Sequence, residues 1–502
     1  MAIFTRILKN LGAMFTGRLL TIVQQVIIPP IFIHRYSTAQ FGEWSILSGT
    51  VAALAILNFG VQTYMNQDLA VRYARGDFEN YHIRQSTALR LLLGVVLVAG
   101  TLSLVVFLLP LDTMLKLDIG RRTTQLTAYF LAIQVLLSFL NGYVAGIFMG
   151  VAMAHRGAYW NNFQALLTAL VLLGCVSLHL PFPVLAGVQV VTMSIAIVAV
   201  LIDIRRTSPA IFPSLRYWDA AAAEDMLKPS GYFGLLTICN FLTYQAPVIL
   251  IGRVLGPVAV TGFVVMRLVF SMCRQILAMF TQSMGAEITN LFGRSDWTSL
   301  SRLYDYSERF IFFLIPLVNT AVLIASPVLI TLWMHKRVEL FSPYPYMLSA
   351  AISMVISLKE HKYQFQFSTN THEELARVMF LSYIGMIAVS IAAVHLFGIV
   401  GFLWTWLAVE ILQIIRIVRL NMKLFSSFER LEFKYLRRLS AICICSLLFA
   451  LALLERTASL PMLWQIALSL VSAAILTACS WPLFGVGDVL RKMSAQFSRK
   501  LA

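Results

Sequence analysis

Two arginines lie seven residues apart within 260–285, a segment that is otherwise apolar enough to cross a lipid bilayer. Because an α-helix turns by about 100° per residue, Arg267 and Arg274 fall on one face, roughly 10 Å apart along the axis. The residues that continue this face are small or polar, namely Ser271, Ala278, Thr281 and Gly285. A lipid-facing arginine at this depth is costly, so the face is expected to line protein or a wet cavity. Two fixed positive charges in such a cavity indicate an anionic substrate.

The composition is that of a polytopic membrane protein. Of the 502 residues, 59% are apolar and 12% are charged, whereas charged residues make up about a quarter of a soluble protein. The formal net charge of +16 does not indicate a nucleic-acid partner, because the basic residues cluster in short loops between apolar runs. We expect these residues to orient the helices and to contact anionic membrane lipids.

Motifs for catalysis or metal binding are missing from the sequence. It contains no nucleotide-binding loop, zinc-protease motif or nucleophile elbow. Its six cysteines fall inside apolar segments, without the spacing of metal ligands or of a disulfide framework. We therefore expect neither an enzyme nor a cofactor or metal. If such a membrane protein transports a cargo, the absence of a nucleotide site means that an ion gradient, the membrane potential or consumption of the cargo drives it.

Apolar runs of about 20 residues predict an all-α membrane protein with about fourteen transmembrane helices. The predicted helices span residues 11–33, 41–65, 86–109, 124–148, 161–180, 183–203, 230–252, 260–285, 309–333, 345–366, 376–396, 398–420, 439–454 and 462–484. Most lysines and arginines of the loops fall on the side that holds the N-terminus, with the largest group in 416–438. The positive-inside rule therefore places both termini in the cytoplasm.

Three short matches between the two halves of the chain indicate an internal duplication at an offset of about 218 residues. The matching pairs are 31–35 with 249–253, 73–78 with 292–297, and 179–180 with 395–396. Six helices per repeat is an even number, so both halves insert the same way up, as in transporters built from parallel repeats. The predicted parts are an N-lobe (1–204), a cytoplasmic inter-lobe linker (205–229), a C-lobe (230–422), and a basic cytoplasmic segment with two extra helices and a tail (423–502).

Three stretches of the sequence resemble a known family. These are the FIHRYSTAQFGEW stretch at 32–44 before the second helix, Asn58-Phe59-Gly60-Val61 within it, and Phe397-Gly398-Ile399-Val400-Gly401 at the start of the twelfth. They are similar to the first-hairpin turn, the helix-two Gly motif and the Gly-rich helix-twelve start of the polysaccharide (O-antigen and exopolysaccharide) flippases. This family is part of the multidrug/oligosaccharidyl-lipid/polysaccharide (MOP) exporter superfamily, and the resemblance covers roughly 10–420 in layout.

The resemblance implies two six-helix lobes that face each other in a V and work by alternating access. It implies an undecaprenyl-diphosphate-linked oligosaccharide as cargo, as in O-antigen and lipopolysaccharide synthesis, with polysaccharide polymerase and assembly proteins as partners. The cationic cavity of the family is matched here by Arg267 and Arg274. Arginine suits a diphosphate because its planar fork forms two parallel, charge-assisted hydrogen bonds. The alternative is a structural role, in which the two arginines pair with a carboxylate or with helix-end carbonyls.

Other charged residues within the predicted helices each have two interpretations. Arg18, in the first helix, either extends to the cytoplasmic interface or contacts the cargo. Lys359 and Lys362 lie three apart and share a face with His361 nearby, in the cytoplasmic third of 345–366. They form either a charged helix end in water or a cationic mouth that binds the lipid headgroup.

Glu410 is the deepest carboxylate in the sequence, about twelve residues into its helix. It either balances an arginine or binds a coupling proton or Na⁺, because burial favours the protonated form of a carboxyl group. Glu43, near the outer end of the second helix, is a second candidate for ion coupling.

Translocation of a lipid-linked oligosaccharide from the cytoplasmic to the outer leaflet of a bacterial inner membrane is the favoured function. A multidrug/cation antiporter of the same superfamily is the first alternative, although basic residues in the cavity disfavour cationic drugs. A membrane-embedded glycan ligase or glycosyltransferase is the second. Such an enzyme usually needs a large outer loop, and the longest one predicted here, 110–123, is short.

Overall fold

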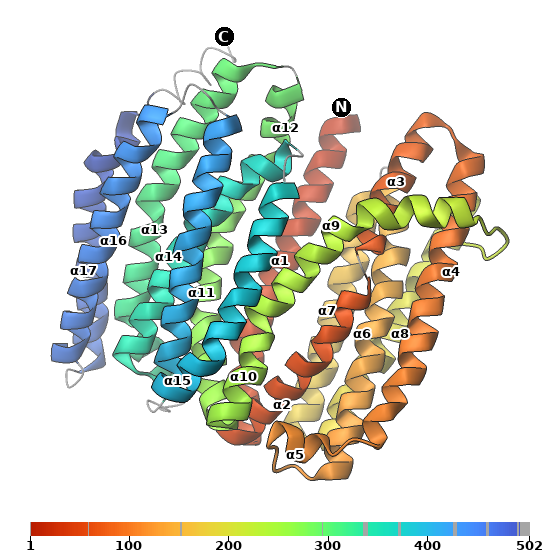
Figure 1. Ribbon diagram of the computed structural model, residues 1–502, viewed down its shortest axis with the longest axis horizontal. Coiled ribbons are helices and arrows are strands. Elements are labelled where there is room, and N and C mark those ends of the chain that lie inside the picture. The colour runs from red at the N-terminus through yellow and green to blue at the C-terminus, as the bar shows by residue number, and fades with distance from the viewer. Residues whose placement is uncertain are drawn as a thin grey trace. The chain divides into compact units, whose positions relative to one another are not determined.

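The computed structural model describes residues 2–58, 60–150, 153–293, 295–334, 340–369, 373–424, 429–457, 461–488 and 491. Within these ranges the regular elements are α-helices and short 3₁₀ turns (Figure 1). Contacts between residues divide the chain into two compact units, Met1–Thr261 and Gly262–Ala502. The lobe boundaries predicted from the internal repeat stay a prediction.

The first unit holds the elements up to the start of α11. They are α1 (Ala2–Arg35), α2 (Thr38–Val51), η1 (Ala52–Asn58), α3 (Val61–Arg75), α4 (Phe78–Leu102), η2 (Ser103–Phe107), α5 (Leu111–Leu115), α6 (Arg121–Gly150), α7 (Ala154–Ser177), α8 (Phe182–Thr207), η3 (Pro209–Ile211), α9 (Ala220–Tyr244) and α10 (Ala246–Leu255). The second unit holds most of α11 (Pro257–Ser283), α12 (Gly285–Gly293), α13 (Trp297–Trp333), α14 (Pro343–Ser368), α15 (Glu373–Leu424), α16 (Glu429–Thr457) and α17 (Met462–Phe484).

Twelve segments of the described chain are long and apolar enough to cross a membrane. One of them is α15, which contains two helices joined at Gly398, where the backbone is not helical. With α15 divided in two and α14 added, the twelve segments account for the fourteen predicted helices. The expected fold class, an all-α polytopic membrane protein, is confirmed.

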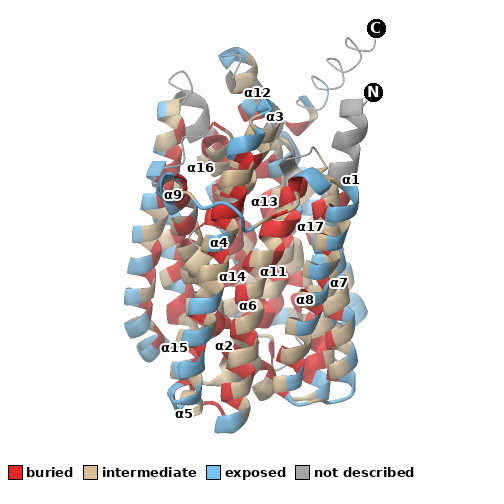
Figure 2. Ribbon diagram, turned by 90° about the vertical axis from the view of Figure 1, so that its right-hand side faces the viewer, coloured by how far each residue is buried: buried red, intermediate tan, exposed pale blue. Residues whose placement is uncertain are grey.

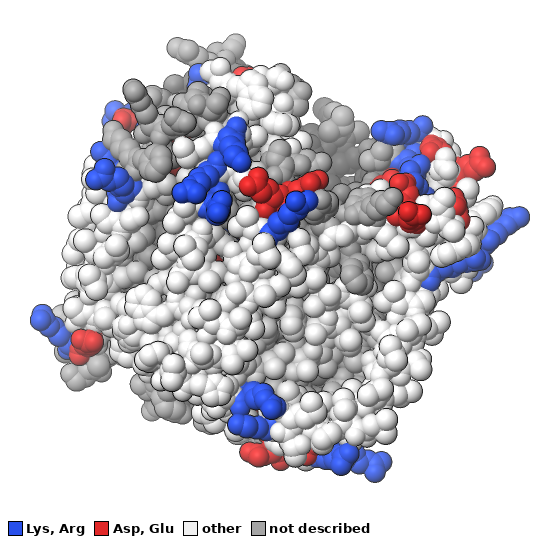
Figure 3. Space-filling view, in the orientation of Figure 1, with Lys and Arg blue, Asp and Glu red and all other residues white. Residues whose placement is uncertain are grey.

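Side-chain exposure follows the pattern of a membrane protein. Large apolar residues are exposed on several helices, for example Leu170 of α7 at 59% and Leu412 of α15 at 62%. Figure 2 shows exposed residues along both helices. On the face shown in Figure 3, most charged side chains gather near the helix ends, and the surface along the helices is uncharged. Lipid would cover such a surface, since exposed leucines at this density are unfavourable in water.

Two predicted helices are each interrupted in the structure. The second was expected to run over 41–65, but its regular part ends at Asn58, and Gly60 has a left-handed backbone with φ 70° before α3 begins. A left-handed conformation is accessible to glycine at little cost and ends a helix. The seventh predicted helix was expected over 230–252, but the helix is interrupted at Gln245, between α9 and α10. In addition, α9 begins at Ala220, so the second part of the predicted linker is helical.

The core of the first unit explains the early start of α9. Ala222 and Met226 are buried in a cluster that also contains Tyr81 and Tyr143 from α4 and α6. The solvent side of the same turn carries Asp225, which forms an ion pair with Arg84 of α4. An apolar face and a paired charge therefore attach the first turns of α9 to the first unit.

The core of the second unit is built around α13. Ile311 and Phe312 of α13 pack with Leu277 of α11 and Met354 of α14. Phe484, at the end of α17, lies edge-on to Phe312 with ring centroids 6.0 Å apart. This packing fixes α11 and α14 against the same helix, and these two helices provide most of the candidate site.

Two glycines shape the bend in α15. Gly398 has a φ of 61°, which separates the two spans of this element. Gly401 is buried, and a Cβ atom at this position would collide with the carbonyl oxygen of Ala393. The glycines of the 397–401 motif thus permit a tight turn and a close approach of two backbone segments.

Gly401→Ala is expected to destabilise the protein by about 1–3 kcal/mol, because the added methyl group overpacks this bend. Thermal unfolding in detergent, followed by fluorescence, would measure the loss. Gly385→Ala is the matched control, since a Cβ there meets no atom within 4 Å, and alanine favours a helix by up to about 1 kcal/mol over glycine. Equal unfolding temperatures for the two variants would contradict the steric role of Gly401.

Candidate functional site

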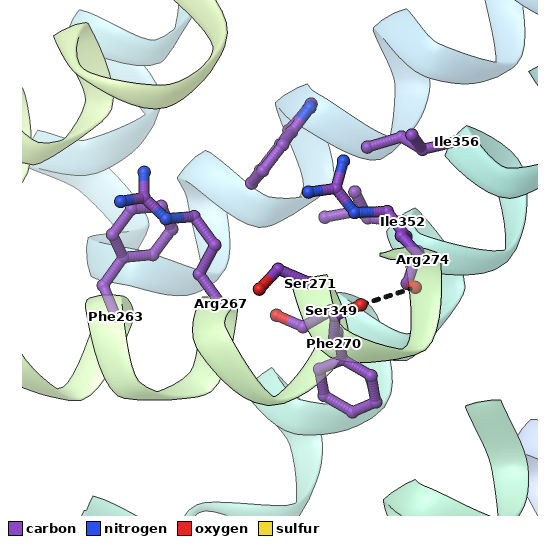
Figure 4. A pocket seen from close by; sticks show the side chains of 10 residues that line it. Phe263, Arg267, Phe270, Ser271, Arg274, Ser349, Ile352 and Ile356 are labelled. Carbon is purple, nitrogen blue, oxygen red and sulfur yellow. Dashed lines mark hydrogen bonds between the residues drawn. The ribbon is translucent and has the colours of Figure 1, made fainter. Parts of the chain in front are cut away.

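Arg267 and Arg274 lie in the wall of one pocket, which belongs entirely to the second unit. The space between its walls, together with the open solvent at its mouth, amounts to about 320 Å³. Its wall is formed by side chains of α11, α14 and α15, namely Phe263, Arg267, Phe270, Ser271, Arg274, Ser349, Ile352, Ser353, Ile356 and Trp406. Figure 4 shows both guanidinium groups extending to the same side of α11, whereas the ring of Phe270 extends away from them.

The two arginines keep part of their surface accessible at the pocket. Both are half-buried, and the guanidinium carbon of Arg267 lies 5.4 Å from the ring centroid of Phe263. A cation over an aromatic face is stabilised by the quadrupole of the ring. The site therefore presents a positioned positive charge.

Hydroxyl groups on α14 form another part of the wall. Ser349 and Ser353 are four residues apart, so they fall on one face of the helix. The hydroxyl of Ser353 donates a hydrogen bond to the carbonyl oxygen of Phe270, at 3.3 Å, which holds α14 against α11 (Figure 4). Among the described residues that line the pocket, none is acidic. The pocket thus combines positive charge, hydroxyl groups and apolar surface, a combination that favours an anion with an apolar or sugar neighbour.

Trp406 connects the pocket with a buried ion pair. Its ring lines the pocket, and its indole N–H donates a hydrogen bond to Oε1 of Glu410, at 3.0 Å. The other carboxylate oxygen of Glu410 accepts from the ammonium group of Lys359. Lys359 and Glu410 are 3% and 0% exposed, so water does not reach this pair from the described surface.

Lys359 makes three hydrogen bonds within this buried network. Besides Glu410, its ammonium group donates to the hydroxyl oxygen of Tyr383 at 2.7 Å and to Oε1 of Gln413 at 2.9 Å. Tyr383 in turn donates to Oε1 of Glu410 at 2.9 Å. Burying a charged pair is costly unless further hydrogen bonds satisfy both partners, and here they do.

Lys362 belongs to a second buried ion pair. Its ammonium group contacts the carboxylate of Glu308 on α13 and lies 2.5 Å from the hydroxyl oxygen of Tyr304. Next to it, Nε2 of His361 lies 2.9 Å from the hydroxyl oxygen of Ser307. One ion pair of α14 therefore attaches it to α13 and the other attaches it to α15.

These pairs correct the two interpretations of Lys359 and Lys362. Neither a charged helix end in water nor an open cationic mouth is present, because both side chains are buried and paired with carboxylates. The carboxylate partners of the two lysines could not be predicted, because Glu308 and Glu410 lie about fifty residues away along the chain. Helix periodicity relates only near neighbours. Glu410 does balance a basic residue, but this residue is a lysine of the same unit rather than an arginine.

The remaining predicted residues lie in the first unit. Glu43 is buried and accepts a hydrogen bond from the backbone N–H of Asp118, at 2.5 Å. This hydrogen bond holds the segment after α5 against α2, so Glu43 has a structural role. Arg18 is exposed on α1. Ion coupling by Glu410 and Glu43 and cargo contact by Arg18 stay predictions. In the described part of the chain, no group of three His, Cys, Asp or Glu side chains is placed to hold a metal ion.

Solved structures with a similar fold are transporters of the MOP superfamily. The lipid II flippase MurJ, in an inward closed conformation, aligns with a TM-score of 0.68 and 9% identity over 95% of this chain and 99% of that one. An inward-facing multidrug resistance MATE family transporter aligns with a TM-score of 0.66 and 12% identity over 82% of this chain and 96% of that one.

A third similar structure is described by the polarity of its binding pocket. It is a MOP superfamily transporter from Pyrococcus furiosus whose binding pocket is described as having reverse polarity, with a TM-score of 0.53, 12% identity and coverage of 87% and 96%. No protein-family model and no curated protein sequence matches the chain. At these identities the likeness shows the fold, so the chain is a multi-pass membrane protein with the fold of MOP superfamily transporters.

Proposed function

We propose that the protein translocates a lipid-linked oligosaccharide whose diphosphate binds between Arg267 and Arg274. The observation that carries this proposal is the pocket itself, in which both guanidinium groups extend to one side of α11 and Ser349 and Ser353 of α14 line the same wall. Charge-assisted hydrogen bonds from arginine to phosphate are about twice as strong as neutral ones, and low dielectric surroundings strengthen them further.

The chemistry of the pocket wall indicates which part of the cargo it binds. Its wall carries two guanidinium groups and several serine hydroxyls, which suit a diphosphate better than an uncharged sugar or a polyprenyl chain. The pocket thus serves the diphosphate, which is common to all such cargo, and the glycan and the lipid extend beyond it.

The fold supports transport, and the charge of the pocket selects among transport functions. One similar structure is named a lipid II flippase and another a multidrug resistance transporter. A cationic drug would meet two arginines and no carboxylate among the described residues of the pocket wall. The multidrug/cation antiporter is therefore the weaker alternative.

Reconstitution tests the proposed function. Purified protein would be placed in vesicles with a fluorescent polyprenyl-diphosphate disaccharide, and a membrane-impermeant reductant would measure the fraction of the lipid that changes leaflet. We expect the protein to increase the accessible fraction above that of protein-free vesicles, with a much smaller increase for a polyprenol-linked disaccharide that lacks phosphate. Equal movement of the two lipids would refute recognition of the diphosphate.

The proposed location is the bacterial inner membrane, with both termini in the cytoplasm. Single cysteines would be introduced into a variant without the six native cysteines and labelled with a membrane-impermeant maleimide in intact cells. We expect labelling between Leu111 and Thr123, and none at the termini or in 416–438 until the cells are opened. Labelling of one terminus from outside would contradict the even number of spans.

A further inference from the structure

The side chains around Lys359 form a small cage of oxygen atoms in the second unit. Its walls are the carboxylate of Glu410, the hydroxyl of Tyr383 and the amide oxygen of Gln413. Three N–H groups of one ammonium meet these three oxygens. The cage is closed to water, since Tyr383, Glu410 and Gln413 are each at most 2% exposed.

The orientation of the amide shows that the cage is built for a cation. Gln413 directs its oxygen at Lys359, and its Nε2 is buried without a hydrogen-bond partner. A buried amide nitrogen without a partner is unfavourable, so the contact of the oxygen with the positive charge must offset this cost. Trp406 and Tyr383 also donate to Oε1 of Glu410, which fixes the carboxylate.

We propose that Glu410, Tyr383 and Gln413 form a monovalent-cation site that the chain fills with its own Lys359 ammonium group. A primary ammonium group is close to K⁺ in size and carries the same charge. Lys359 therefore acts as a tethered counter-cation, and no dissolved ion needs to enter the cage while it is there. In this proposal the wild-type protein does not use Glu410 to take up Na⁺ or K⁺.

The proposed cation site does not depend on the identity of the cargo, so it can be tested without a transport assay. Removing the ammonium group leaves a carboxylate, two further oxygens and the volume of the missing side chain. Na⁺ or K⁺ with one or two waters would occupy that volume, because both ions prefer oxygen ligands. Choline is too large for the cage, and its quaternary ammonium group has no N–H to donate, so it serves as the inert cation.

Thermal unfolding of the purified full-length chain in detergent provides the test, at equal ionic strength in NaCl, KCl or choline chloride. For Lys359→Ala we expect unfolding about 5 °C higher in NaCl or KCl than in choline chloride, saturating with concentration, as for a bound ligand. Wild-type protein should unfold at one temperature in all three salts. Lys359→Ala/Glu410→Gln should lose the difference, and Lys423→Ala, which alters an exposed pair with Glu374, should behave as wild type.

Two outcomes would overturn the proposal, and in a third case the wild type decides. Lys359→Ala that is folded but indifferent to the cation would overturn it. The proposal would also be overturned if Lys359→Ala/Glu410→Gln folded while Lys359→Ala stayed unfolded in every salt. The cage without its ammonium group would then bind no ion. If neither variant folds, the wild type decides: stabilisation specific to Na⁺ or K⁺ contradicts a cage filled by Lys359, and its absence supports one.

Discussion

Arg274→Ala is expected to reduce transport of a polyprenyl-diphosphate glycan by a factor of about 10–100. A hydrogen bond to a charged group contributes about 1.5–3 kcal/mol, and this substitution removes a guanidinium group from the pocket wall. Arg274→Lys should restore only part of the activity, because the charge is retained and the planar fork is lost. Leaflet exchange in vesicles, per molecule of inserted protein, measures both effects.

The control for this experiment is an arginine outside the pocket in the same unit. Arg302 is exposed on α13 and does not line the pocket, so Arg302→Ala should transport like the wild type. Full activity of Arg274→Ala in normally inserted protein would remove the arginine pocket from the mechanism. Equal loss in Arg274→Ala and Arg302→Ala would point to a general effect of charge instead.

Glu410→Gln is expected to reduce the free energy of unfolding by about 3–5 kcal/mol, because it leaves the Lys359 ammonium group buried without a counter-charge. Glu308→Gln should have a similar effect through Lys362. Unfolding temperatures in detergent at neutral pH measure the loss. Lys359→Met/Glu410→Gln should recover much of the stability, since removal of both charges leaves no unpaired ion.

The exposed pair of Lys423 with Glu374, 4.0 Å apart, provides a matched control. Both side chains are mostly exposed, and such pairs contribute about 0–1 kcal/mol. Glu374→Gln should therefore leave the unfolding temperature nearly unchanged. A small effect of Glu410→Gln, comparable to that of Glu374→Gln, would mean that the buried pair does not hold α14 to α15.

The sequence was sufficient for the fold class and for the arginine face. Apolar run length predicts helices because a bilayer has a fixed thickness, and a spacing of seven places Arg267 and Arg274 together within one helix. Both arguments use distances along one element. The breaks at Gly60 and Gln245 were missed because hydropathy varies smoothly across them and depends little on backbone conformation.

The rest of the site depends on contacts between helices, which periodicity cannot predict. Lys359 and Lys362 share a face, but only the structure shows that α13 brings Glu308 to one and α15 brings Glu410 to the other. Trp406, Tyr383 and Gln413 gave no signal of their own, because aromatic and amide side chains are common in membrane helices. A useful hint was present, since two lysines inside an apolar segment require carboxylates elsewhere in the chain.

Lipid binding to the purified protein tests the central claim most directly. Native mass spectrometry would compare undecaprenyl diphosphate, undecaprenyl monophosphate and undecaprenol, with wild-type protein and with the Arg267→Ala/Arg274→Ala variant. The arginine pocket predicts that the diphosphate binds the wild type at least tenfold more tightly than undecaprenol and that the double substitution removes this preference. Equal binding of the three lipids to the wild type, or an unchanged preference in the double variant, would contradict it.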